Sequence, residues 1–237
     1  MPKKIRVSVI LPTFNEAGNI IDLVEDLIHY LSQKRMSFEI IVVDDDSPDK
    51  TGILARKYFT KNHEVRVIIR KKDKGLANSI RTGIEAAVGE MVVVMDTDFN
   101  HEPRVVPRLV EKCQKYDLVI GSRFIPGGGM ADKKRELLSK IYNKYLIQPI
   151  LQSPVSDNLS GFFAMKYEKL SKLEFDKIFY GYGDYFIRLI YYSVAKKYKF
   201  TEVPSFYIER TYGQSKSKFL QMFQDYVYSA IKLRLNK

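Results

Sequence analysis

The segment Met91-Val92-Val93-Val94-Met95-Asp96-Thr97-Asp98 consists of five apolar, strand-compatible residues followed at once by two carboxylates two positions apart. Side chains i and i+2 of a strand point to the same side, so Asp96 and Asp98 are expected to converge where the strand ends. Two hard anionic oxygens at such an edge suit a Mg²⁺ or Mn²⁺ ion that holds a diphosphate. Taken alone, an Asp-x-Asp sequence also fits the start of a loop or a helix N-cap. The remaining sequence is needed to choose between these interpretations and a metal site.

Strand and helix patterns alternate on both sides of this segment. The further expected strands cover residues 6–11, 38–43, 65–69, 118–120, 159–165 and 201–208. The expected helices cover residues 20–31, 51–59, 76–88, 105–115, 136–151, 182–198 and 219–235. This alternation predicts an α/β fold with a mostly parallel central sheet and helices on both faces. Pro12 is expected to close the first strand, and Pro204 places the last strand at a sheet edge.

The composition excludes several classes of protein. The chain has 237 residues, enough for one large domain with a small appendage. Its single cysteine, Cys113, excludes an internal disulfide, and with one cysteine and three scattered histidines no structural zinc site is expected. No stretch approaches the roughly 18 apolar residues that cross a bilayer, and the N-terminus leads directly into a strand pattern, so no cleavable signal is expected.

The formal charge of +11 calls for an anionic partner: nucleic acid, anionic lipid or a phosphorylated small molecule. No zinc finger, RNA-recognition signature or basic zipper is present, so no nucleic-acid partner is expected. The alternative is a basic surface that binds no specific anionic partner.

Each early strand ends in a polar cluster, and these clusters are residues 12–16, 44–47, 70–75 and 96–98. Because the carboxyl ends of parallel strands share one edge of the sheet, the clusters are expected to line a single cleft. There is no Gly-x-x-x-x-Gly-Lys-Ser/Thr segment and no Gly-x-Gly-x-x-Gly after the first strand. P-loop enzymes and dinucleotide-binding Rossmann enzymes are therefore disfavoured.

Three segments carry a family resemblance: Leu11–Glu16, Glu39–Asp49 and Val94–His101. They resemble the inverting glycosyltransferases of family 2, and in particular dolichol-phosphate mannose synthases. The likeness continues in order through Asp117–Arg123, Ser160–Phe162 and Glu209–Lys216, and covers about residues 5 to 220. Each motif alone is weak, but six in the same order are specific.

The resemblance implies a GT-A fold, with a catalytic domain over residues 1–217. The apolar and basic pattern of residues 218–237 predicts an amphipathic helix, which can lie in a membrane interface or pack on the domain. The resemblance also implies metal-dependent, inverting transfer of a hexose from a nucleotide sugar to a polyprenyl or dolichyl phosphate, with mannose from GDP-mannose as the first expectation. The enzyme would act peripherally at the cytoplasmic face of a membrane. Separate membrane-anchoring subunits, or a transmembrane segment missing from this chain, would attach it to the membrane.

Site residues follow from the same resemblance. The expected nucleotide-sugar-binding residues are Pro12, Phe14, Glu16, Asp45, Lys74, Asp96 and Thr97. The expected ligands of Mg²⁺ or Mn²⁺ are Asp96, Asp98 and Asn100, where Asn100 stands in place of the Gln or Ser of many relatives. The expected acceptor-phosphate-binding residues are Arg123, Arg135, Ser160, Arg210 and Lys216. Those expected to take part in catalysis are Asp98, Arg123, Arg210 and Lys216.

Four alternatives remain open at this point. The donor can be a UDP-sugar, as in dolichyl-phosphate glucose synthesis. The acceptor can be a hydroxyl group with Asp184 as its base, although Asp184 also fits a helix N-cap after a glycine turn. A nucleotidyltransferase would also place acids at strand ends, but it usually has a Gly-rich loop where this chain has Pro12-Thr13-Phe14-Asn15-Glu16. The last alternative is a subunit that binds a sugar nucleotide without catalysis.

Overall fold

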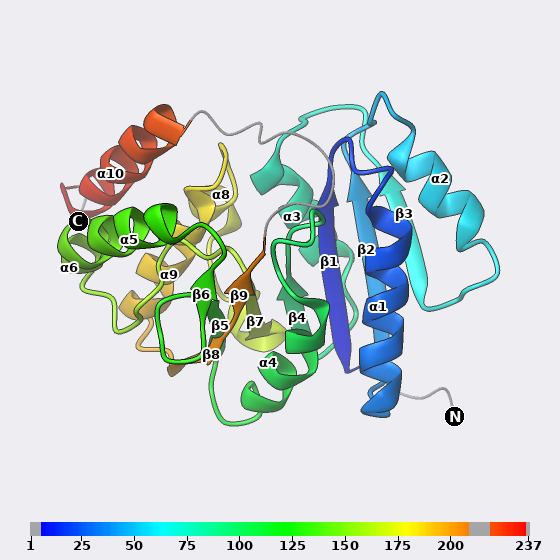
Figure 1. The fold of residues 1–237 in the computed structure, drawn as a ribbon, viewed down its shortest axis with the longest axis horizontal. Helices are drawn as coiled ribbons and strands as arrows, with labels where there is room; N and C mark the ends of the chain where they lie inside the picture. Colours follow the sequence, from blue (N-terminus) through cyan, green and yellow to red (C-terminus); the bar gives the residue numbers. More distant parts are fainter. Residues whose placement is uncertain (1–5, 209–218, 236–237) are drawn as a thin grey trace.

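The computed structural model describes residues 6–208 and 219–235. A seven-stranded sheet with strand order β3-β2-β1-β4-β7-β5-β8 forms its centre (Figure 1). The strands are β1 Val7–Thr13, β2 Phe38–Asp44, β3 Val65–Ile69, β4 Met91–Val94, β5 Leu118–Ser122, β7 Phe163–Lys166 and β8 Phe200–Pro204. Only β7 runs antiparallel to its neighbours, so the expected mostly parallel sheet is confirmed. A second, two-stranded sheet pairs β6 Gly129–Met130 with β9 Phe206–Tyr207.

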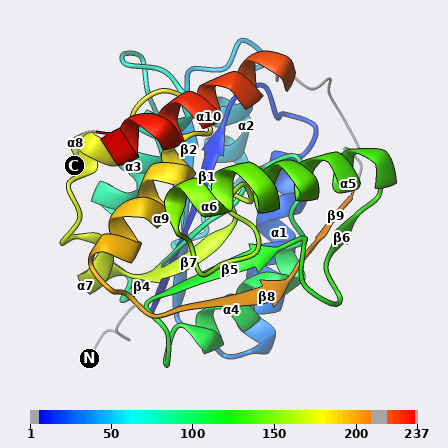
Figure 2. The same ribbon diagram turned by 90° about the vertical axis from the view of Figure 1, so that its left-hand side faces the viewer.

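Helices cover both faces of the central sheet (Figures 1 and 2). The longer ones are α1 Ile20–Gln33, α2 Thr51–Tyr58, α3 Leu76–Ala86, α4 Val106–Lys112, α5 Lys133–Tyr142, α9 Tyr185–Ala195 and α10 Phe219–Leu235. The short ones are α6 Gln148–Leu151, α7 Tyr167–Leu170, α8 Phe175–Ile178 and a 3₁₀ turn at Pro103–Val105, while a π-helical turn, Asn143–Ile147, joins α5 to α6.

Alternate residues of the strands feed two separate cores. Val9 of β1 packs in one core with Leu27 of α1 and Leu109 of α4. The next residue, Ile10, packs in the other core with α3 and α9 residues such as Ile80 and Phe186. Strands buried on both faces explain the continuous apolar runs of the sequence.

The first strand does not stop at Pro12 as expected, but continues to Thr13. β4 pairs with β1 only as far as the Ile10–Val94 pair, and the Met95 N–H then donates to the Ile10 carbonyl. Pro12 lies beyond that ladder, so its missing N–H interrupts no pairing with β4. The expectation for Pro204 was correct, since it ends β8 at the edge of the sheet.

The C-terminal helix α10 packs against α9 and α6 (Figure 2). Ser229 and Ala230 are buried in this contact, whereas Tyr228, Ile231 and Leu235 are exposed. Within residues 6–208 and 219–235, no helix combines the length and the apolar character that a membrane span requires. The division of the chain at residue 217 remains a prediction.

Candidate active site

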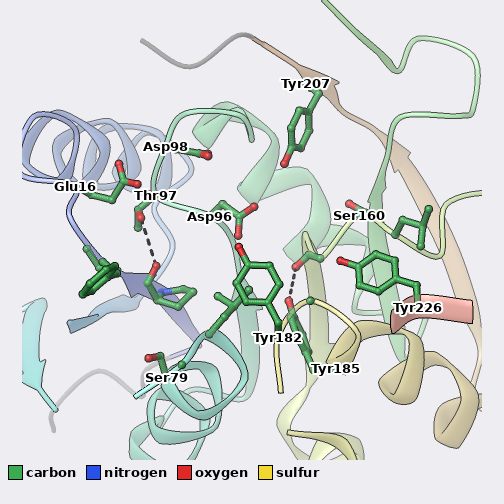
Figure 3. A pocket seen from close by; sticks show the side chains of 18 of the residues that line it. Glu16, Ser79, Asp96, Thr97, Asp98, Ser160, Tyr182, Tyr185, Tyr207 and Tyr226 are labelled. Carbon is green, nitrogen blue, oxygen red and sulfur yellow. Dashed lines mark hydrogen bonds between the residues drawn. The ribbon is translucent and has the colours of Figure 1, made fainter. Parts of the chain in front are cut away.

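A cavity of about 530 Å³ opens at the carboxyl ends of β1, β2 and β4, where the polar clusters were expected to meet (Figure 3). One side is lined by residues from the first four strand ends: Pro12, Thr13, Phe14, Glu16, Asp45, Lys74, Gly75, Leu76, Ser79, Asp96, Thr97 and Asp98. The other side comes from the second half of the chain: Arg123, Arg135, Ser139, Leu159, Ser160, Gly161, Tyr182, Gly183, Tyr185, Tyr207, Phe223 and Tyr226. The sequence-based prediction of a single cleft is therefore consistent with the structure.

Hydrogen bonds to side chains of the β2–α2 connection hold the loop after β1. Backbone N–H groups of Asn15 and Glu16 donate to Ser47 Oγ at 3.0 Å and to Thr51 Oγ1 at 2.9 Å. Phe14, 43% exposed, presents its ring to the cavity from this loop, and the Glu16 carboxylate accepts from Asn19 Nδ2. A rigid loop with an exposed ring can stack on a nucleobase.

Asp45 is buried and organises the adjacent loop. Its Oδ1 accepts from Arg70 Nη1 at 2.6 Å, and its Oδ2 accepts from the Gly75 N–H at 2.6 Å. The same Arg70 nitrogen donates to Ser79 Oγ at 2.7 Å. Gly75 has φ 138°, a conformation that glycine adopts without strain. Lys74, just before it, is 3.2 Å from Asp46 Oδ2 and also lines the cavity.

Asp96 and Asp98 line the same cavity, but they reach it from a turn. β4 ends at Val94, and Phe99 has a left-handed φ of 60°, so strand alternation is not what brings the carboxylates together. The Asp96 side chain is 38% exposed, whereas Asp98 is buried. The Thr97 hydroxyl donates to the Pro12 carbonyl at 3.3 Å and ties this turn to β1 (Figure 3).

Asn100 is buried behind Asp98 and is not part of the cavity lining described above. Its N–H donates to Asp98 Oδ1 at 3.1 Å and its Nδ2 to Asp98 Oδ2 at 2.6 Å, so in this arrangement it orients the carboxylate. A direct metal-ligand role for Asn100 stays a prediction.

Within the part of the chain that the structure describes, no cluster of three or more His, Cys, Asp or Glu side chains forms a metal cage. Mg²⁺ usually binds one or two carboxylates together with substrate phosphates and water, and does not need such a cage. Asp96 and Asp98 therefore fit a divalent cation that arrives with a diphosphate.

His101 follows this turn and is 1% exposed. Its Nδ1 accepts a hydrogen bond from the Asp96 N–H at 3.1 Å. Burial lowers the pKa of His101 to about 4, and the nearby Asp98 charge offsets part of this effect. The ring is therefore neutral near pH 7, as an accepting Nδ1 requires.

Arg123 lies across the cavity, directly after β5, and is bound to a buried partner. Its Nε donates to Asp157 Oδ2 at 2.7 Å and its Nη2 to Asp157 Oδ1 at 2.8 Å. Asp157 is completely buried, and its backbone N–H donates to Glu202 Oε1 at 3.2 Å. Asp157 thus takes the Nε–H and one Nη2–H, so a ligand of Arg123 would bind through Nη1 and the second Nη2–H.

Two arginine side chains contact the ring of Tyr207 in β9. The Cζ atoms of Arg123 and Arg135 lie 5.3 and 5.8 Å from the ring centroid, within the range of cation–π contacts. Ser160 is buried beside them and donates from Oγ to the Gly121 carbonyl at 2.5 Å. The predicted phosphate-binding residues Arg123, Arg135 and Ser160 thus line one side of the cavity. Arg210 and Lys216 lie outside the described residues.

Four tyrosines line the cavity that the sequence did not single out as site residues. Tyr182 comes from the loop before α9, Tyr185 from the first residue of α9, Tyr207 from β9 and Tyr226 from α10 (Figure 3). Burial raises the pKa of Tyr226 well above that of a free tyrosine, so its hydroxyl stays protonated and can donate. Their positions in amphipathic and Tyr-rich segments resemble core positions, which is why sequence alone did not reveal them.

Asp184 does not line the cavity with its neighbours Tyr182 and Gly183. Its two oxygens accept from both terminal nitrogens of Arg188, which is fully buried, and Oδ1 also accepts from the Tyr182 N–H at 3.2 Å. Arg188 further donates to the Ile178 and Tyr180 carbonyls. In this structure Asp184 holds the loop that carries Tyr182.

The chain is similar to known glycosyl transferases. The model of the family described as glycosyl transferase family 2 matches residues 8–174. The chain is 37% identical over 225 residues to the dolichol-phosphate mannosyltransferase of Pyrococcus furiosus, covering 92% of this chain and 61% of that protein. It is 32% identical over 221 residues to the undecaprenyl-phosphate mannosyltransferase of Micrococcus luteus, covering 89% of this chain and 87% of the relative.

Among solved structures, glucosyl-3-phosphoglycerate synthase of Mycobacterium tuberculosis, in complex with Mn²⁺, UDP and glucosyl-3-phosphoglycerate, shares the fold. The TM-score is 0.72 at 24% identity, and the match covers 98% of this chain and 80% of that one. The expected GT-A fold is thereby confirmed. Since the family model matches most of the chain and the alignment with the archaeal relative spans nearly all of it, the chain belongs to glycosyl transferase family 2, with the glycosyltransferase domain of that family.

Proposed function

We propose that the protein transfers a hexose, with mannose from GDP-mannose as the first choice, from a nucleotide sugar to a polyprenyl phosphate. One observation carries this proposal: a single cavity joins the Asp96–Asp98 turn to the Arg123–Asp157 pair on a family 2 fold. The named activities of the archaeal and bacterial relatives support the choice of sugar and acceptor. The chain spans 61% of the length of the Pyrococcus furiosus relative, so the activity of the whole protein is part of the proposal.

The charges on the two sides of the cavity suggest how the reaction proceeds. Asp96 and Asp98 would hold a Mg²⁺ or Mn²⁺ ion, which when bound offsets the charge of the departing nucleoside diphosphate. A structural neighbour crystallised with Mn²⁺ and UDP supports the use of such an ion in this fold. Arg123 and Arg135 would orient the acceptor phosphate through fixed N–H donors. Attack in line with the departing diphosphate inverts the anomeric carbon.

A phosphate acceptor needs no base. The second pKa of a phosphate monoester is about 6, so near neutral pH it is already an anionic nucleophile that requires only positioning. Among the described residues that line the cavity, none is a histidine. The carboxylate of Asp184 is bound to Arg188. The structure thus gives no support to the alternative of a hydroxyl acceptor with Asp184 as base.

The Asp184→Asn variant separates these two roles. We expect it to lower the free energy of unfolding by about 3–5 kcal/mol, because Arg188 would stay buried without its counter-charge. Turnover of the folded fraction should fall by much less than the roughly 10²–10⁴-fold loss that follows removal of a general base. Denaturant unfolding and the initial rate, each compared with Asp176→Asn on the exposed end of α8, measure both effects. A rate loss of the base-removal size in folded protein would restore the hydroxyl-acceptor alternative.

We also propose that the enzyme works as a peripheral protein at the cytoplasmic face of a membrane. Exposed apolar side chains of α10 (Tyr228, Ile231 and Leu235) lie on the same helix as the basic Lys232 and Arg234, a composition suited to an anionic interface. α5 and the π-helical turn that follows it also expose Leu137, Leu138, Ile141 and Tyr145.

Ile231→Asp is expected to reduce co-sedimentation with vesicles that contain phosphatidylglycerol, because it places a negative charge among the interfacial apolar groups. Ile53→Asp, at an exposed apolar position of α2, is the matched control and should sediment like the wild type. Equal sedimentation of all three proteins would show that Ile231 of α10 does not contribute to membrane binding.

The proposed activity is tested by incubating the protein with GDP-mannose and a short-chain polyprenyl phosphate in detergent, with Mn²⁺, Mg²⁺ or EDTA. Mass spectrometry should detect a polyprenyl-phosphate hexose with either ion and none in EDTA, and the unphosphorylated polyprenol should not react. Parallel reactions with UDP-glucose and UDP-N-acetylhexosamine identify the donor. No product with any donor, although nucleotides bind, would indicate the binding-only alternative, and transfer to the polyprenol would refute the phosphate acceptor.

A further inference from the structure

His101 is a buried polar residue with no role in the reaction described so far. Its ring stacks on Phe162 at a centroid distance of 4.7 Å and an interplanar angle of 17°. Its other contact is edge-on with Tyr207, at 5.1 Å and 80°. Phe162 is fully buried, so the imidazole lies between a fixed aromatic face and the β9 tyrosine. Its Nδ1 is thereby held in place to accept the hydrogen bond from the Asp96 N–H.

The turn that carries the two carboxylates needs such support. The left-handed φ of Phe99 is unfavourable for a bulky side chain, and such backbone conformations persist only when the surroundings hold them. Thr97 is bound to the Pro12 carbonyl, and Asn100 holds the Asp98 carboxylate. The hydrogen bond to His101 fixes the backbone of Asp96, the more exposed of the two carboxylate residues.

His101 also connects this turn to the opposite side of the cavity. The imidazole contacts the Tyr207 ring, and the guanidinium groups of Arg123 and Arg135 contact the same ring. A donor diphosphate held by the cation and an acceptor phosphate held by the guanidinium groups can react only if cation and guanidinium groups keep a fixed separation, to within about 0.5 Å in working sites. A chain of rigid ring contacts from Asp96 to Arg123 supplies such a fixed separation.

We propose that His101 is a positioning residue: through Nδ1 it holds the Asp96–Asp98 turn, and through Tyr207 it sets the distance of that turn from the arginine pair. This role rests on the proposed function insofar as it assumes that a metal–diphosphate group binds at the Asp96–Asp98 turn and the acceptor phosphate at the arginine pair. It requires a neutral imidazole with its proton on Nε2, because Nδ1 accepts from a backbone N–H.

Two substitutions separate the hydrogen bond from the packing. His101→Phe keeps a ring between Phe162 and Tyr207 but has no acceptor, whereas His101→Asn restores an acceptor near the Nδ1 position. Outer-sphere partners of metal ligands typically contribute about 10–100-fold to metal affinity. We therefore expect His101→Phe to weaken Mn²⁺ binding in the presence of GDP by about that factor, and His101→Asn to recover a large part of the loss. His63→Phe, at an exposed histidine before β3, is the control.

Electron paramagnetic resonance of free Mn²⁺ measures this affinity without any turnover, so it remains informative if no sugar is transferred. Wild-type affinity in a folded His101→Phe, or equal losses in the Phe and Asn variants, would overturn the positioning role. Should His101→Phe not fold, ¹⁵N NMR of the imidazole in the wild-type protein decides: the Nε2–H tautomer is expected, and the Nδ1–H tautomer would contradict the proposal. A wild type that binds Mn²⁺ and GDP but forms no product would instead refute the proposed function alone.

Discussion

Arg123→Ala is expected to lower the turnover number by about 10²–10³-fold, the usual effect of removing one preorganised donor to a developing or transferred charge. Arg123→Lys should not restore the rate. A lysine cannot reproduce the paired bonds that Nε and Nη2 make with Asp157, nor place a guanidinium group over the Tyr207 ring. The measurement is the initial rate of hexose transfer at saturating donor and acceptor.

Stability has to be separated from catalysis at this position. Removing Arg123 alone leaves the carboxylate of Asp157, which is completely buried, without its counter-charge, at a cost of about 3–5 kcal/mol. The double variant Arg123→Gln with Asp157→Asn removes both charges and should be more stable than Arg123→Ala, yet equally slow. Arg108→Ala, at an exposed arginine of α4, controls for general loss of positive charge. A folded double variant with wild-type turnover would exclude Arg123 from the reaction.

Asp98→Ala is expected to abolish measurable transfer, with a loss of at least about 10³-fold, because it removes a buried anionic oxygen from the site that would hold the cation. Asp96→Ala should cause a comparable loss. Asp176→Asn, which changes an exposed carboxylate far along the chain, should leave the rate unchanged. Initial rates over a series of Mn²⁺ concentrations check this. Full activity in EDTA with both Asp96 and Asp98 replaced would refute a metal role.

Much of the architecture could be predicted because local patterns determine it. The apolar run Met91–Val94 forms β4 and is buried, as its continuous apolar sequence predicts for a central strand. The strand that contains Pro12 was harder to delimit. A proline ends a strand only where its N–H is needed, and that depends on where the neighbouring β4 stops, which no local pattern reveals.

The residues that line the site could be predicted better than their arrangement in space. Asp96 and Asp98 line the cavity as expected, but a turn with a left-handed Phe99 brings them there, and the period-two rule does not apply to a turn. The partner of Arg123 was not foreseen, because Asp157 is 34 residues away and the pair forms only through tertiary packing. The cavity tyrosines were missed for a related reason, since buried aromatic residues of a core and of a cavity wall look alike in sequence.

The central claim is that Asp96 and Asp98 hold a divalent cation opposite the arginine pair, where it binds a nucleoside diphosphate. Calorimetric titration of the wild type and of the Asp96→Asn/Asp98→Asn variant with GDP and with UDP, each with Mn²⁺ or with EDTA, tests it most directly. The account predicts that Mn²⁺ strengthens binding of at least one nucleotide to the wild type and has no such effect on the variant. Equal affinity with and without Mn²⁺ for both nucleotides, or the same gain in the variant, would contradict it.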